Sequence, residues 1–134
     1  MRRKIATILG LVALAAGCGD PAPPPAPTPA VPTITDTFSG TLAVQSTDRH
    51  PFIVQQVGGL QVTLTALDPT ASVGIGIGLA VGATCTVTHS VTTGAGTAAQ
   101  LTGTATIAGA FCVSIYDVGT LVEPVNYTIT VLHS

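Results

Sequence analysis

The chain has 134 residues, of which 46% are hydrophobic and only 7% are charged. Four basic side chains stand against six acidic ones, and the formal net charge at pH 7 is −2. Three of the four basic residues lie at positions 2–4, so Arg49 is the single basic residue of the remaining chain. Nucleic-acid binding and attraction to anionic membrane surfaces both need clustered Lys and Arg side chains. The composition excludes both of these classes for the chain beyond its N-terminal segment.

Residues 1–17 have the pattern of a bacterial lipoprotein signal peptide. Three basic residues precede an apolar run over residues 5–16, and the small residues Ala16 and Gly17 precede Cys18. The run is about half of the ~20 residues that a transmembrane helix needs, which favours a cleaved segment. We expect cleavage before Cys18, export of the chain and attachment of lipid to the Cys18 thiol. An ordinary secretory signal followed by an incidental cysteine is the alternative.

The residues after Cys18 bear on the destination of the protein. Gly19 follows the cysteine and Asp20 comes only one position later, so the usual signal for retention at the inner membrane is not formed. In a bacterium with two membranes we therefore expect lipid anchoring at the outer membrane. Such an anchor is compatible with a domain that faces the periplasm and with one that faces the cell surface.

Residues 18–32 form a segment rich in proline and alanine. Seven of the twelve residues 21–32 are proline, which favours an extended polyproline-type conformation. At ~3.1 Å per residue, residues 20–32 span roughly 40 Å between a membrane anchor and a folded domain. We interpret it as a stalk. A proline-rich ligand for an aromatic groove is the alternative.

Residues 33–134 are long enough for one modest core, and their composition predicts an all-β domain. They contain twenty threonines and thirteen valines, and they alternate apolar and polar residues with the period of two that a half-buried strand requires. Gly, Pro and Asp clusters separate these runs. We predict a two-sheet antiparallel sandwich of about eight strands. The clearest alternating runs are residues 60–66, 85–91, 111–116 and 127–131.

Residues 73–79 form a predicted strand with glycine at every second position. Val73, Ile75, Ile77 and Leu79 share one face, and bare glycines form the other. A glycine face indicates that a backbone or a ring lies close against it. We favour packing within the domain over the alternative, a flat groove for an extended polymer or peptide.

Cys85 and Cys112 remain once Cys18 has been assigned to lipid, and an exported chain lets them pair. The phases of the two strands conflict with this disulfide. Cys85 is in phase with Val87 and Val91, whereas Cys112 is out of phase with its apolar neighbours. The pairing requires that Cys85 lies before the regular strand or that one face is misread. Two separate buried thiols are the alternative.

The sequence contains no recognisable catalytic motif of the serine-hydrolase, zinc-protease or phosphate-loop type. We expect no enzyme activity and no cofactor. Asp117 and Glu123 flank one loop and are weak candidates for calcium, although Asp117 is better explained as closing a turn with Gly119. We interpret residues 48–50 as a solvated loop. His89 is expected to be hydrogen-bonded and partly buried.

Two pairs of segments resemble the bacterial pre-peptidase C-terminal domain. Residues 50–54 and 58–64 are similar to its opening strands, and residues 108–117 and 126–131 are similar to its closing hairpin. The resemblance covers nearly all of residues 38–131 and implies a jelly-roll-like β-sandwich without catalytic activity. The chain departs from the family after Asp68, where a Val-Gly-Ile-Gly stretch stands at positions at which many members carry aspartates.

These observations predict a non-catalytic, lipid-anchored protein of the cell envelope. Its sandwich is expected to be a binding or accessory module for a protein partner or an envelope assembly. The alternative is a carbohydrate-binding module for an extracellular polysaccharide. Sugar sites usually need exposed aromatic platforms, and we expect the core to take most of the five aromatic residues, Phe38, Phe52, Phe111, Tyr116 and Tyr127.

Overall fold

The computed structural model describes residues 17, 19, 22–25 and 33–134, and Cys18 lies outside this described part. Within it the secondary structure is all-β, and no segment forms a helix that could cross a membrane. The strands are β1 (Ile34–Leu42), β2 (Thr47–Val54), β3 (Gly58–Asp68), β4 (Val73–Val81), β5 (Thr84–Thr93), β6 (Leu101–Ala105), β7 (Gly109–Tyr116) and β8 (Val125–His133).

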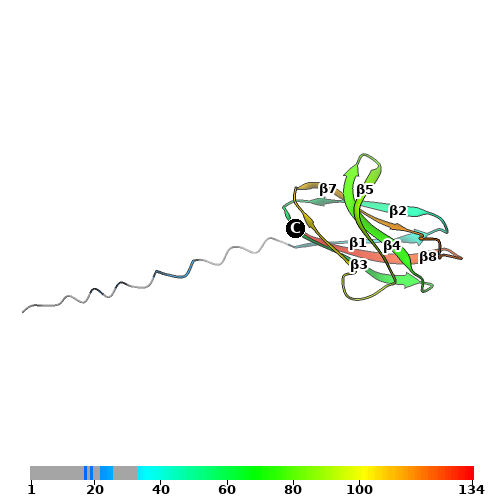
Figure 1. Cartoon of the computed structure of the whole chain (residues 1–134), viewed down its shortest axis with the longest axis horizontal. Coiled ribbons are helices and arrows are strands. Elements are labelled where there is room, and N and C mark those ends of the chain that lie inside the picture. The colour runs from blue at the N-terminus through cyan, green and yellow to red at the C-terminus, as the bar shows by residue number, and fades with distance from the viewer. Residues whose placement is uncertain (1–16, 18, 20–21, 26–32) are drawn as a thin grey trace, which may run out of the picture.

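The eight strands form two antiparallel four-stranded sheets packed face to face (Figure 1). One sheet has the order β1-β8-β3-β6 and the other has the order β2-β7-β4-β5. Every connection except the β4–β5 hairpin crosses from one sheet to the other, which is the arrangement of a jelly roll. The predicted two-sheet sandwich of about eight strands is confirmed.

The core lies between the sheets and follows from the alternation in the sequence. In β3, Leu60, Val62 and Leu64 are buried, as the period-two pattern predicted. In β8, Val125, Tyr127, Ile129, Val131 and His133 alternate in the same way between exposed or half-buried neighbours. Inward apolar side chains of both sheets therefore form one continuous core.

The strand register sorts the loops to the two ends of the sandwich. Ile34 pairs with His133, and Leu42 pairs with Val125 at the opposite end of the same ladder. The start of β1 and the C-terminus of the domain therefore lie at the same end of the sandwich (Figure 1). The β1–β2, β3–β4, β5–β6 and β7–β8 connections lie at the other end, which we call the loop end.

The outer face of β4 is packed by other parts of the domain, which confirms the packing interpretation of its glycines. The ring of Tyr116 occupies the space that a side chain at Gly74 would take. A methyl of Val87 covers Gly76, and the backbone of β5 at Thr86 lies directly over Gly78. The absence of side chains therefore lets an aromatic ring and a neighbouring backbone approach β4 closely.

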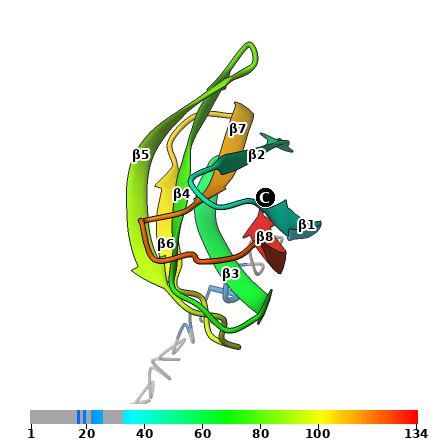
Figure 2. The ribbon, with the colours of Figure 1, turned by 90° about the vertical axis from the view of Figure 1, so that its right-hand side faces the viewer.

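The disulfide between Cys85 and Cys112 is present, and it explains why β5 bends over β4. Cys112 pairs with Gly78 in β4, and Cys85 pairs with Ala80, so the bridge joins the two neighbours of β4 across its outer face. Two strands flanking a third are normally about 9–10 Å apart, but the two cysteine Cα atoms are only 5.8 Å apart. The hairpin between β4 and β5 projects beyond the neighbouring strands (Figure 2).

A β-bulge resolves the conflict of phase between the two cysteines. Ile77 pairs with His89, and the next residue, Gly78, pairs with Val87, so β5 carries one extra residue at Thr88. An extra residue reverses which face the following side chains occupy. Cys85 therefore points to the outer face while Val91 packs against the core. The expectation that Cys85 and Val91 share a face was wrong.

The disulfide closes a loop with a sequence separation of 27 residues. On the chain-entropy account, a loop of this length stabilises the fold by about 3.5 kcal/mol. The disulfide requires the backbone of β5 to lie against Gly78. The stabilisation by the disulfide therefore depends on the glycine face of β4.

We predict that Gly78→Ala destabilises the domain by about 2 kcal/mol or more, because a Cβ would collide with the backbone of β5 rather than with a flexible side chain. Under oxidising conditions, a smaller fraction of the Gly78→Ala protein than of the wild type should contain the Cys85–Cys112 disulfide. The matched control is Gly103→Ala, in a strand position where a Cβ meets no heavy atom within 4 Å. Chemical unfolding and thiol titration of both variants measure the two effects. Equal stability of the two variants would contradict this account of β4.

Candidate functional site

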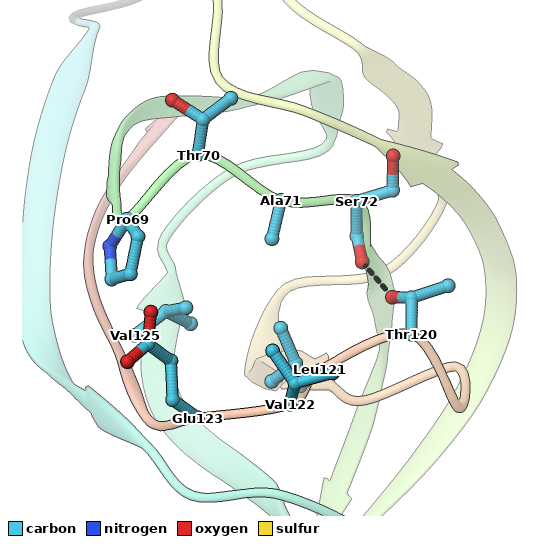
Figure 3. A pocket seen from close by; sticks show the side chains of 9 residues that line it. All are labelled: Pro69, Thr70, Ala71, Ser72, Thr120, Leu121, Val122, Glu123 and Val125. Carbon is cyan, nitrogen blue, oxygen red and sulfur yellow. Dashed lines mark hydrogen bonds between the residues drawn. The ribbon is translucent and has the colours of Figure 1, made fainter.

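Two connections at the loop end enclose a hollow of about 220 Å³ (Figure 3). One side is the β3–β4 connection and the other is the β7–β8 connection. Ala71 of the first and Leu121 of the second point toward one another across it. The residues that line the hollow are Pro69, Thr70, Ala71, Ser72, Thr120, Leu121, Val122, Glu123 and Val125.

The carboxylate of Asp117 fixes the shape of the β7–β8 connection. Its Oδ1 accepts hydrogen bonds from the backbone N–H groups of Gly119, Thr120 and Leu121, at 2.8, 3.0 and 3.2 Å. Its Oδ2 accepts a fourth from the N–H of Gln45 in the β1–β2 connection, at 2.8 Å. The predicted turn with Gly119 is confirmed, and Gly119 has the positive φ of 94° that glycine adopts most easily.

The two loops are tied together at the rim of the hollow. The hydroxyl of Thr120 donates a 2.6 Å hydrogen bond to the carbonyl oxygen of Ser72 (Figure 3). Below it, Leu121 and Val125 are buried and form an apolar floor. Val122 is 93% exposed, and Glu123 beside it is also exposed. The hollow therefore combines an apolar floor with a carboxylate at its edge.

The loop end is acidic. Glu123 and Asp117 lie in the β7–β8 connection, and Asp68 lies at the end of β3 next to Pro69. The four loops that meet here contain no Lys, Arg or His. Arg49 lies in β2, with an exposed side chain. The site suits a ligand that places an apolar group in the hollow and a positive charge near Glu123.

The geometry gives no support to the calcium hypothesis for Asp117 and Glu123. Calcium needs several oxygen ligands, and both oxygens of Asp117 already accept backbone N–H groups. Across residues 33–134 and the few described residues before them, no three His, Cys, Asp or Glu side chains come together to hold a metal ion.

Sequence reasoning missed a polar network between the edge strands β1 and β2. Residues 48–50 belong to β2, so their interpretation as a solvated loop was wrong. The Tyr127 hydroxyl donates a 2.9 Å hydrogen bond to Asp48, and His50 Nε2 lies 2.6 Å from the same hydroxyl. Since the one hydroxyl proton goes to Asp48, the His50 Nε2 must carry a hydrogen. Phe38 stacks on the His50 ring, with 4.8 Å between ring centroids.

Burial sets the proton affinities in this network. It lowers the pKa of His50, an effect that the nearby charge of Asp48 only partly offsets. Burial also raises the pKa of Tyr127, and the hydrogen bond to Asp48 adds to this rise. Both groups are thus held neutral near pH 7. They serve as hydrogen-bonding groups inside the sandwich.

A second pair lies further along the same edge. Buried His133 donates its Nε2 hydrogen to Asp36 at 2.7 Å. Asp36 is in β1, as Asp48 is in β2, and both strands are at the edge of their sheets. Inward charged side chains on edge strands oppose pairing with other chains. The network and the pair therefore close this side of the sandwich.

The remaining candidate residues lie apart from the loop-end hollow. His89 is exposed rather than partly buried, although its ring does bond the Thr88 hydroxyl at 3.1 Å. Phe52, Phe111 and Tyr127 are buried. Phe38 and Tyr116 are half-buried, so no aromatic side chain of residues 33–134 is an exposed platform.

No family model and no curated protein matches the chain. The resemblance to pre-peptidase C-terminal domains therefore stays a prediction.

We predict that Asp117→Asn lowers the thermal midpoint of unfolding at pH 7. The N–H of Gln45, together with three N–H groups of the β7–β8 connection, holds the pKa of Asp117 below its ordinary value of 3.8. The carboxylate hence stabilises the folded state above that pH and stops doing so as the pH falls through the lower, folded-state pKa. Thermal unfolding of variant and wild type should therefore converge toward pH 2.

Asp68→Asn, at an exposed position at the end of β3, is the control for this measurement. It should change the midpoint little at either pH. A difference between Asp117→Asn and wild type that is the same at pH 7 and pH 2 would argue against an ionised Asp117 as the group that orders the loop.

Proposed function

We propose that the protein is a non-catalytic, lipid-anchored module of the bacterial cell envelope that binds a protein partner at its loop end. Lipid on Cys18 holds it at the outer membrane, and residues 18–32 form the stalk. The domain contributes recognition and assembly, while any chemistry belongs to its partner.

The observation that carries this proposal is the position of the hollow relative to the start of the domain. The chain joins the sandwich at Thr33, at the end that also holds His133. The hollow lies at the opposite end of the strands. A tether that leads into β1 therefore directs the hollow away from the membrane.

The chemistry of the loop end supports a partner with a particular surface. Val122 is almost fully exposed beside the apolar floor of Leu121 and Val125, and Glu123 supplies the charge. Apolar anchors in a pocket dominate protein–protein affinity, and complementary charge guides the encounter. We infer a partner segment with an apolar side chain next to a Lys or Arg.

The roles of the titratable side chains favour a non-catalytic module. Asp48, His50 and Tyr127 bond one another between the sheets, and Asp36 bonds His133. Asp117 bonds the backbone of its own loop and of the β1–β2 connection. Each of these groups has a role in holding the fold.

Site-specific photo-crosslinking in intact cells tests the proposal. A crosslinking residue at position 122 should capture a discrete protein, because Val122 is 93% exposed at the hollow. The same residue at position 81 is the matched control, since Val81 is 64% exposed at the far end of the sandwich. Glu123→Lys should reduce the adduct at position 122 several-fold.

Equal capture at positions 122 and 81 would contradict the proposal, because it would indicate contact without a defined site. No adduct at position 122 in intact cells would contradict it as well. An adduct that Glu123→Lys leaves unchanged would overturn the inferred positive charge of the partner.

A further inference from the structure

A pocket of about 130 Å³ lies against the disulfide on the outer face of the β2-β7-β4-β5 sheet. Cys85 and Cys112 both line it. The other lining residues come from β2 and from the β4–β5 hairpin: Arg49, Pro51, Ala80, Gly82, Ala83 and Thr84. Cys85 is half-buried, whereas Cys112 is only 1% exposed. A reagent that enters this pocket therefore meets Cys85 first.

The single Lys or Arg side chain of residues 33–134 lines the same pocket. This residue, Arg49, is exposed. The one ion pair within this part of the chain joins His133 to Asp36, so the Arg49 guanidinium has no carboxylate partner there. Asp48, its neighbour in sequence, bonds Tyr127 between the sheets. A cation beside a disulfide attracts a thiolate reagent and stabilises a cysteine that leaves as a thiolate.

The disulfide holds a part of the hairpin that has no further strand beside it. The β4–β7 ladder ends where Leu79 pairs with Phe111. Beyond this point, residues 80–85 pair only with one another among the described strands. This tip of the hairpin projects past the neighbouring strands (Figure 2). The bond between Cys85 and Cys112 is the covalent link that joins the tip to β7.

A buried hydroxyl without a partner lies beneath the same strand. Ser114 Oγ of β7 is the only buried side-chain nitrogen or oxygen in the described residues that has no hydrogen-bond partner in the protein. The point that a Cβ on Gly76 would occupy is 3.2 Å from this oxygen and 2.7 Å from a methyl of Val87. Strand β5 thus reaches across β4 to the hydroxyl. Burying an unpaired hydroxyl costs free energy, and movement of Val87 away from β4 would let water bond Ser114.

We infer that the Cys85–Cys112 disulfide is a thiol-exchange site, and that its opening by a dithiol releases the tip of the β4–β5 hairpin. A thiolate of the dithiol enters the pocket and forms a bond with the Cys85 sulfur. The bond between the two cysteines breaks, and its electron pair leaves on Cys112, where the charge of Arg49 stabilises the new thiolate.

The second thiol of the reagent completes the exchange. It loses its proton to water and attacks the reagent sulfur of the mixed disulfide, which frees Cys85. The two cysteines then take up protons from water. Overall, the protein gains two electrons and two protons, and the dithiol is oxidised to a disulfide.

The walls of the pocket suit a thiolate carried on a small apolar group. Pro51, Ala80 and Ala83 are apolar, and Arg49 supplies a positive charge in a domain that is otherwise acidic. The pocket lies toward the end of the sandwich opposite the loop-end hollow, since β4 runs from the loop end to the hairpin. The inference therefore does not depend on the proposed function, and either can fail alone.

Reduction of the native full-length chain, purified in mild detergent, tests the site. Dithiothreitol is the probe, and alkylation of the released thiols followed by intact mass gives the rate. We expect a rate that is unchanged by urea below the unfolding transition, because the reagent reaches Cys85 in the folded protein. Arg49→Gln removes the positive charge and should slow reduction by about threefold or more, whereas Arg49→Lys should restore the wild-type rate.

Thr35→Glu is the matched control, because it lowers the net charge by the same single unit at an exposed position of the opposite sheet. It should be reduced at the wild-type rate. A rate that rises steeply with urea would overturn the inference, because reduction would then require unfolding. Equal rates for Arg49→Gln and wild type would overturn the role assigned to Arg49.

The same measurement distinguishes two sources of the dithiol. Reduced thioredoxin, a protein dithiol, replaces dithiothreitol, and each rate is divided by the rate of that reagent with oxidised glutathione. A higher ratio for thioredoxin would assign the site to a protein partner. A higher ratio for dithiothreitol would assign it to a small molecule.

Hydrogen exchange of oxidised and reduced protein tests the release of the hairpin. After reduction, the amides of residues 80–87 should exchange about tenfold faster or more, while β3 and β8 keep their protection. Unchanged exchange in residues 80–87 would overturn the release. Faster exchange throughout the domain would overturn it as well, because the disulfide would then hold the whole fold rather than the tip.

Discussion

The bare outer face of β4 is the constraint on which the rest of the structure depends. Because Gly78 carries no side chain, the backbone of β5 can lie on it and bring Cys85 to Cys112. Because Gly74 carries none, the Tyr116 ring can occupy the space over that glycine. The glycines of β4 therefore permit the bend of the β4–β5 hairpin, the formation of the disulfide and the packing on the outer face of the β2-β7-β4-β5 sheet. The inward side of the same strand supplies Val73, Ile75 and Ile77 to the core.

The strands could be predicted because alternation is a local pattern. The disulfide could be predicted from the number of cysteines. Alternation in residues 60–66 requires only neighbouring positions, and two cysteines remain after Cys18. The bulge at Thr88 could not be predicted, since nothing in residues 84–93 marks an extra residue. The hydrogen bonds of Asp48 and His50 to Tyr127 join residues that are more than 70 positions apart in the sequence. Polar residues at inward positions of an edge strand also have the sequence pattern of a loop. The loop-end hollow needs two distant connections to meet, which no local pattern encodes.

The proposed function is located at one end of the sandwich, away from the start of β1. The acidic loop end offers an apolar floor and a carboxylate to a protein segment. The β1–β2 edge is closed by Asp36, His133 and the Tyr127 network, so the domain resists edge-to-edge association. The proposed function assumes that the domain is held at a membrane, because a tether at the start of β1 directs the loop-end hollow away from that membrane.

The measurement that tests this assumption most directly is metabolic labelling with a clickable fatty acid, followed by the intact mass of the purified protein. Expressed in a bacterium with two membranes, the wild-type chain should carry the label and begin at Cys18. The Cys18→Ser variant should remain unlabelled and keep residues 1–17, because we expect Cys18 both to accept the lipid and to specify the cleavage site. An unlabelled wild-type chain recovered from the soluble fraction would contradict the account of a tethered module.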